Sequence, residues 1–123
     1  MLRALLVLIL LSLACEVAKP PAYSWQTAIE EVAWSYCEAA RRCDPGGFYS
    51  EEGIQRCKDR AVVDMCETDG TCQVDLGEEA AEIVAECTQV LDALEDPGSD
   101  GCFALVYFSA VPPQCSGFYD LQP

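Results

Sequence analysis

The sequence predicts an all-α fold: a small disulfide-stapled bundle of three to four helices behind an N-terminal signal peptide. Three observations support this prediction. Apolar residues recur at helical spacing over three segments, and each segment ends in a turn-forming stretch. Eight of the nine cysteines follow the apolar N-terminus, an even number that suits disulfides. A chain of 123 residues is enough for one domain.

The N-terminal segment has the organisation of an export signal, which we assign to residues 1–14. Arg3 supplies the charged start, residues 4–13 are largely apolar, and Ala14 is small. A bilayer core is about 30 Å thick and a helix rises about 1.5 Å per residue, so this segment is too short to span it. We therefore expect the segment to be removed.

Cys15 directly follows this segment, and the bond before it fits two kinds of signal-peptide cleavage. Ser12 and Ala14 fit the small-x-small rule of an ordinary signal peptidase. Residues 11–15, Leu-Ser-Leu-Ala-Cys, are also similar to a bacterial lipobox, after which Cys15 would be acylated, for example with palmitate. Ser12 and Leu13 depart from the usual lipobox pattern. We expect a lipid anchor in the cell envelope, with a secreted or soluble periplasmic protein as the alternative.

Residues 15–23 would form a lipidated tether, and residues 24–123 a disulfide-rich helical domain. The first helix of this domain is predicted over 24–43, because its apolar residues are separated by three or four positions. These residues are Trp25, Ile29, Val32, Tyr36, Ala40 and Cys43. Ser24 would cap the start of the helix, and Asp-Pro-Gly-Gly at 44–47 would end it.

The same periodicity predicts two further helices. Ser50 would cap a helix over 51–65 with Ile54, Cys57, Ala61 and Met65 on its inner face. A third helix would begin near Asp75, which forms with Glu78 a pair similar to a capping box. The expected inner face of the third helix consists of Ala80, Ile83, Cys87, Val90, Leu91 and Leu94.

The last apolar segment, 102–111, leaves helix and strand open because nearly all of its residues are apolar or small. We favour a short helix, since the rest of the chain is helical. Its apolar stripe would contain Phe103, Val106, Tyr107 and Ala110. Pro112 and Pro113 would end whichever element forms.

The cysteines predict four disulfides and an oxidising compartment. Without Cys15, the even set is Cys37, Cys43, Cys57, Cys66, Cys72, Cys87, Cys102 and Cys115. No Cys-x-x-Cys spacing, typical of zinc and thioredoxin-type sites, occurs in this set.

Spacing favours particular disulfide pairs among the many combinations that eight cysteines allow. Cys37 and Cys57 are each ten residues from Gly47, so a helical hairpin about that turn would bring them together. Cys87 with Cys102, across an acidic loop, is the second choice. The other two disulfides would then join Cys43, Cys66, Cys72 and Cys115.

The chain is strongly acidic, with 21 Asp and Glu against 7 Lys and Arg and a net charge of −14. Such a field repels nucleic acid and suits a basic protein partner. Glu78, Glu82 and Glu86 form a ladder of like charge. The ladder would be a solvated acidic face, a surface compensated by Arg56, Lys58 and Arg60 on a neighbouring helix, or a site for a cation or a basic partner.

Other functional chemistry has little support in the sequence. The chain contains no His, which removes catalytic imidazole and histidine metal ligands. Asp96 and Asp100 are a weak alternative for calcium, but an EF-hand aligned on Gly101 would need Glu where Tyr107 stands. We therefore expect no catalytic residues, no cofactor and no enzymatic activity.

Cysteine spacing and helix starts together are similar to a known class. The run from Gly70 through Cys72, Asp75, Cys87 and Cys102 to Cys115, together with Tyr36-Cys37-Glu38-Ala39 and Arg42-Cys43, resembles small cysteine-rich lipoproteins of myxobacteria and their relatives. The resemblance implies a helical envelope lipoprotein without an assigned activity. Glu16 after Cys15 favours the outer membrane by the same resemblance.

From these observations we expect a non-enzymatic, envelope-anchored lipoprotein that acts as a structural or interaction module. The alternative is an acidic ligand-binding module for divalent cations or a basic protein partner. The sequence does not indicate an oligomeric state.

Overall fold

The computed structural model describes residues 22–47 and 49–123, so the predicted signal peptide and Cys15 lie outside the described residues. The helices are α2 (Trp25–Cys43), α3 (Glu51–Val62), α4 (Glu78–Asp92), α5 (Asp100–Phe108) and α6 (Ser116–Asp120). A π-helical turn, Val63–Glu67, extends α3, and a 3₁₀ turn, Pro113–Cys115, precedes α6. The all-α, disulfide-stapled fold that the sequence predicts is confirmed.

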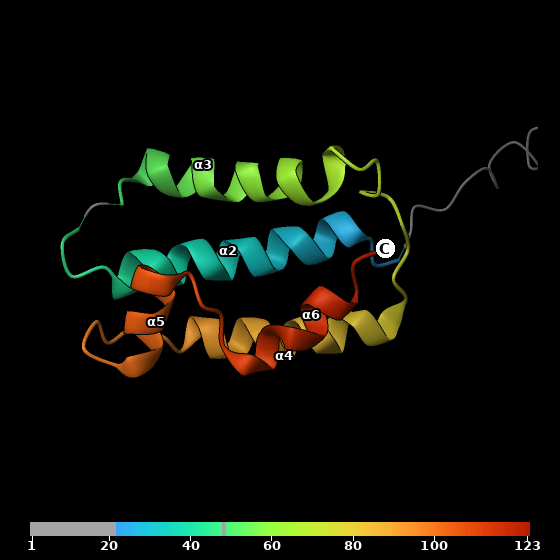
Figure 1. Ribbon diagram of the computed structural model, residues 1–123. Coiled ribbons are helices and arrows are strands. Elements are labelled where there is room, and N and C mark those ends of the chain that lie inside the picture. Colours follow the sequence, from blue (N-terminus) through green and yellow to red (C-terminus); the bar gives the residue numbers. More distant parts are fainter. Residues whose placement is uncertain (1–21, 48) are drawn as a thin grey trace, which may run out of the picture.

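Helix α2 is the centre of the bundle. It lies between α3 and α4, and α5 packs against it near its C-terminal end (Figure 1). Five of its six predicted inner residues are buried, and Tyr36 is partly buried. Ala28, Ser35 and Ala39 are buried as well. A helix with neighbours on several sides buries more than one stripe, and its second face is lined with small residues.

Serine side chains cap three helix starts in the described chain. The Oγ atoms of Ser24, Ser50 and Ser99 accept backbone N–H bonds from three residues further on, at 3.1 to 3.2 Å. The predicted caps at Ser24 and Ser50 are thus confirmed, and α3 with its π turn covers the predicted 51–65. Each cap satisfies a backbone donor that the first helical turn leaves without an intrahelical partner.

Helix α4 begins at Glu78, three residues later than the start predicted near Asp75. The backbone before it is occupied by long-range contacts. The N–H of Leu76 donates to the carbonyl of Tyr23 at 2.8 Å, and Asp75 forms an isolated bridge with Ser24. The Asp75 carboxylate accepts the N–H of Gly77 at 2.9 Å instead of capping a helix. Tertiary pairing with the start of α2 therefore delays α4.

The buried face of α4 differs slightly from the predicted one. Ala80, Val84, Cys87 and Leu91 are buried, whereas the predicted Ile83 and Val90 are only partly buried. Helix α4 meets both α2 and α6, so its buried stripe is set by two neighbours.

Helix α5 confirms the choice of helix over strand for the last apolar segment, but the predicted stripe is wrong. Cys102 and Leu105 are buried, while Phe103 and Tyr107 are exposed and Ala110 lies beyond the helix. The Cys43–Cys102 disulfide turns Cys102 inward and thereby fixes the rotation of α5 about its axis. The helix ends before the two prolines, at Phe108, and the C-cap residue Ser109 adopts the left-handed conformation with φ of 50°.

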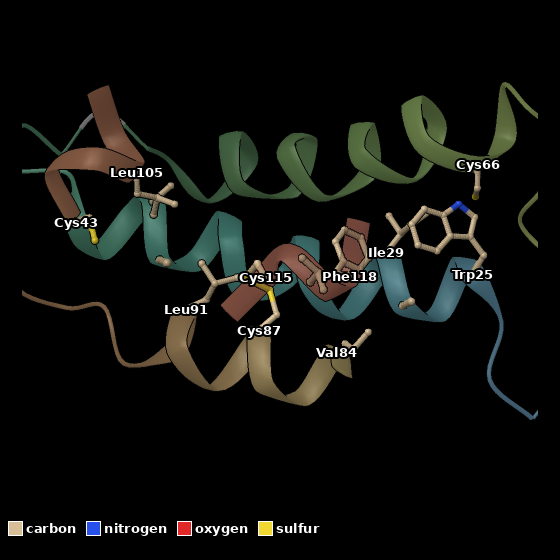
Figure 2. Packing of buried hydrophobic residues seen from close by; sticks show 14 of the residues in the cluster. Trp25, Ile29, Cys43, Cys66, Val84, Cys87, Leu91, Leu105, Cys115 and Phe118 are labelled. Atoms are coloured by element: carbon tan, nitrogen blue, oxygen red, sulfur yellow. A yellow bond between two sulfur atoms is a disulfide. The ribbon is translucent and has the colours of Figure 1, made fainter. Parts of the chain in front are cut away.

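The C-terminal helix α6 was not predicted, yet it contributes a central core residue. Phe118 is buried and stacks on Trp25 with ring centroids 5.2 Å apart (Figure 2). Gly117 permits the close approach of α6 to α4, because a Cβ at this position would lie 2.8 Å from Cγ2 of Ile83.

The four disulfides use all eight cysteines of the described chain. Cys37–Cys57 confirms the pair that spacing favoured. Cys87–Cys102 is wrong, because Cys102 bonds to Cys43 and Cys87 bonds to Cys115. Cys66–Cys72 completes the set. The error follows from the path of the chain: α5 packs on α2, and the segment after it returns along α4 with Cys115.

Arg42 connects the C-terminal ends of α2 and α4. Its guanidinium donates to the carbonyls of Leu91 and Leu94 at 3.0 Å, at the end of α4. These carbonyls lie at and just after the C-terminus of α4, where a positive charge is favourable. Arg42 therefore ties the last turn of α2 to the last turn of α4.

Candidate functional site

An apolar groove of about 340 Å³ lies between α2, the α3 segment with its π turn, and the chain from Ser109 to Tyr119. We call it the α2–α3 groove. Its apolar walls are formed by Ile29, Val32, Ala33 and Tyr36 of α2, Ala61 and Met65 on the α3 side, and Val111, Phe118 and Tyr119 of the C-terminal segment. A recess of this volume is at the small end of the range for ligand-binding pockets.

Trp25 holds together two walls of the groove. Its indole is fully buried, stacks on Phe118 and donates its Nε1–H to the carbonyl of Met65 at 3.1 Å. Met65 belongs to the π turn and Phe118 to α6, so one side chain joins both to α2. On the other side of the groove, Cys37–Cys57 fixes α3 to α2.

The polar groups of the groove lie at its mouth. Arg60 and Asp64 form an exposed ion pair, with 3.3 Å between Nε and Oδ2. Burial, and to a smaller extent the neighbouring Tyr36, raises the pKa of Tyr119 above its usual value of 10.0. Tyr119 therefore stays neutral at physiological pH. With Arg60 and Asp64 paired and Tyr119 neutral, the groove offers contact for apolar groups.

Nucleophilic chemistry has no evident support in this groove. Cys37 and Cys57, which line it, are bonded to each other and are not free thiols. The whole chain lacks His, the usual base for a Ser or Cys nucleophile. The arrangement is suited to binding.

A second cluster of charged side chains lies where α3 meets α2. Lys58 Nζ lies 2.9 Å from the centre of the Trp34 ring and 3.0 Å from Oε1 of Glu38. Arg41 contacts the other oxygen of Glu38 at 2.6 Å. The Lys58 and Glu38 side chains are only 11% and 18% exposed. The hydrogen bond from Lys58 lowers the pKa of Glu38, although desolvation opposes this shift.

These pairs contradict the predicted compensation of the α4 ladder by bases of the second helix. Arg56 pairs with Glu52, Lys58 with Glu38, and Arg60 with Asp64. Helix α3 and helix α4 lie on opposite sides of α2 (Figure 1). The ladder of Glu78, Glu82 and Glu86 is exposed, as expected of a solvated acidic face.

Replacing Lys58 with Met is expected to lower the free energy of unfolding by about 2 kcal/mol at pH 7, because a partly buried ion pair and a cation–π contact are lost. The pKa of Glu38 is lower in the folded than in the unfolded chain, where it is near 4.5. The contribution of Glu38 to the free energy of unfolding is therefore complete above pH 4.5. It disappears as the pH falls through the pKa that Glu38 has in the folded chain. The difference between wild type and Lys58→Met should shrink accordingly.

Urea denaturation at several pH values measures this difference. Arg56→Met is the matched control, because the Arg56–Glu52 pair is exposed and should contribute little at any pH. A deficit of Lys58→Met that stays constant between neutral and acid pH would contradict the assigned pairing.

Asp96 and Asp100, the weak alternative for a calcium site, both have local structural roles. The Asp96 carboxylate accepts the N–H of Gly98 at 2.9 Å, and the Asp96 carbonyl accepts the Ser99 hydroxyl at 2.7 Å. Asp100 lies in the first turn of α5, where a negative charge is favourable. Within residues 22–47 and 49–123, no group of three or more Cys, Asp or Glu is placed to hold a metal ion.

Comparison with protein-family models, with curated proteins and with solved structures finds no match to this chain. The resemblance to small cysteine-rich lipoproteins therefore stays a prediction. None of the described helices combines the length and apolar character needed to cross a membrane. Fold and geometry thus define the class, a disulfide-stapled helical bundle, and its four disulfides are compatible with an exported protein.

Proposed function

We propose that this protein is an exported, non-enzymatic lipoprotein that is anchored in the cell envelope through Cys15 and acts as an interaction module. One observation carries the proposal. The four disulfides account for every cysteine of the described domain, so Cys15 has no partner among them. An unpaired thiol at the end of an export signal has a chemical role if it is acylated.

The interaction role is supported by the surfaces of the domain. The α2–α3 groove supplies apolar contact, and its mouth presents a paired Arg60 and Asp64. The acidic ladder of α4 is a further surface, suited to a basic partner, because no basic residue follows Arg60 in the sequence. Glu16 after Cys15 favours outer-membrane placement through the resemblance alone. A rigid stapled scaffold would hold such surfaces in fixed positions.

Metabolic labelling with palmitate tests the anchor. Wild-type protein should incorporate label and sediment with membranes, whereas Cys15→Ser should lose the label. Glu16→Gln, which changes the adjacent residue and keeps the thiol, should behave as wild type. Unlabelled wild-type protein in the soluble fraction, or label that persists in Cys15→Ser, would rule out the anchor.

A further inference from the structure

The C-terminal part of the chain contains a long segment without charge. Residues 101–119 include no Asp, Glu, Lys or Arg, although such residues make up 23% of the chain and about four would be expected over this length. The segment comprises nearly all of α5, the 3₁₀ turn and most of α6. It forms one wall of the α2–α3 groove and also faces solvent on α5.

Three aromatic side chains of this segment are exposed together, and we call them the aromatic face of α5. Phe103, Tyr107 and Phe108 are 52%, 61% and 71% exposed. The ring of Phe103 lies 4.7 Å from that of Tyr107 and 5.7 Å from that of Phe108. Cys102 and Leu105 occupy the inner side of the helix, so the aromatic rings are held outward. Contiguous exposed apolar groups of this kind mark contact surfaces.

We propose that the aromatic face of α5 inserts into the interfacial layer of the phospholipid bilayer to which the protein is tethered. Aromatic side chains concentrate at the boundary between lipid tails and headgroups. An uncharged segment enters that boundary without the penalty that buried charges carry. The net charge of −14 disfavours anionic surfaces, so zwitterionic headgroups are the matching lipid chemistry.

The dimensions of the chain allow the anchor and the aromatic face to reach one bilayer. Tyr23 lies eight positions after Cys15, so the chain between them can span at most about 29 Å. Helix α2 has 19 residues and is about 28 Å long. Cys43–Cys102 fixes α5 to the C-terminal end of α2, opposite the end at which α2 begins (Figure 1). With α2 lying along the membrane, both ends of the bundle touch its surface.

This inference rests on the proposed anchor, which makes a weak contact effective. A tether converts insertion into an intramolecular step with an effective concentration in the millimolar range for a short linker. Three partly exposed aromatic rings then suffice to hold one face of the domain against lipid. The α2–α3 groove would be held at a fixed orientation to the membrane.

A reconstituted tether tests the contact separately from natural acylation. The oxidised chain beginning at Cys15 is coupled through that thiol to a maleimide phospholipid in phosphatidylcholine vesicles. Phe108→Trp in a Trp34→Phe background places one exposed indole on the aromatic face, since Trp25 is buried. Lipids brominated near the top of the acyl chain should quench its fluorescence about twofold, as expected for an interfacial ring.

Phe103→Ser together with Tyr107→Ser in this background should abolish most of the quenching. Tyr49→Ser, which alters an exposed aromatic residue outside α5, is the matched control and should leave the quenching unchanged. Thermal unfolding of each variant verifies the fold. The proposal would be overturned by no quenching in the parent, by equal quenching in the double-serine variant, or by an indole emission that shifts to the blue only when envelope proteins are added. The last outcome would assign the face to a protein partner.

Discussion

Replacing Cys43 and Cys102 together with alanine is expected to lower the free energy of unfolding by about 4 kcal/mol. This disulfide has the largest sequence separation of the four, 59 residues, and restricts the unfolded chain most. It also fixes α5 on the C-terminal end of α2. Urea denaturation without reductant measures the loss, and both thiols are removed so that no disulfide exchange follows.

The matched control for this variant is Cys66→Ala with Cys72→Ala. These residues are six apart, so their disulfide closes a short loop and should contribute about 2 kcal/mol. Equal losses for the two double variants, or a larger loss for the short loop, would contradict the view that the Cys43–Cys102 bridge organises the bundle.

Replacing Trp25 with alanine is expected to lower the free energy of unfolding by about 3 to 5 kcal/mol, the usual range for deleting a buried large aromatic side chain. Three contacts are lost together. They are the packing in the core, the stacking on Phe118, and the hydrogen bond to the carbonyl of Met65 at 3.1 Å. Chemical denaturation of the oxidised protein measures the loss.

Two further variants separate the causes. Trp25→Phe keeps a ring in the core but removes the indole N–H, so it should lose less than Trp25→Ala while leaving the Met65 carbonyl without this donor. Trp34→Ala alters an exposed tryptophan and should cost about 1 kcal/mol, chiefly through Lys58. A loss for Trp25→Ala no larger than that for Trp34→Ala would contradict the central role of Trp25.

The parts of the fold that depend on local patterns were predictable from the sequence. Helical periodicity located α2 and α3, and serine caps located their starts, because both depend on residues within a few positions. The Cys37–Cys57 pair was predictable for a similar reason, since it closes a hairpin about a single turn.

The remaining features depend on contacts between distant segments. The start of α4 is set by pairing of Leu76 with Tyr23, and the rotation of α5 by the bond from Cys102 to Cys43. The local periodicity of the sequence predicts neither of these contacts. The α2–α3 groove requires Phe118 and Tyr119 to fold back on α2. The aromatic pair Phe118-Tyr119, which begins three positions after the last cysteine, was the available sign in the sequence.

Intact-mass spectrometry of the protein extracted from membranes tests most directly the claim of a lipid-anchored, disulfide-bonded bundle. One spectrum reports both the lipid on Cys15 and the four disulfides. We expect a chain that begins at Cys15, carries the mass of a diacylglyceryl group, and lacks two hydrogens for each of the four disulfides. A chain that begins at Cys15 without acyl mass, or that retains residues 1–14, would contradict the anchor. A mass with free thiols among the other eight cysteines would contradict the stapled bundle.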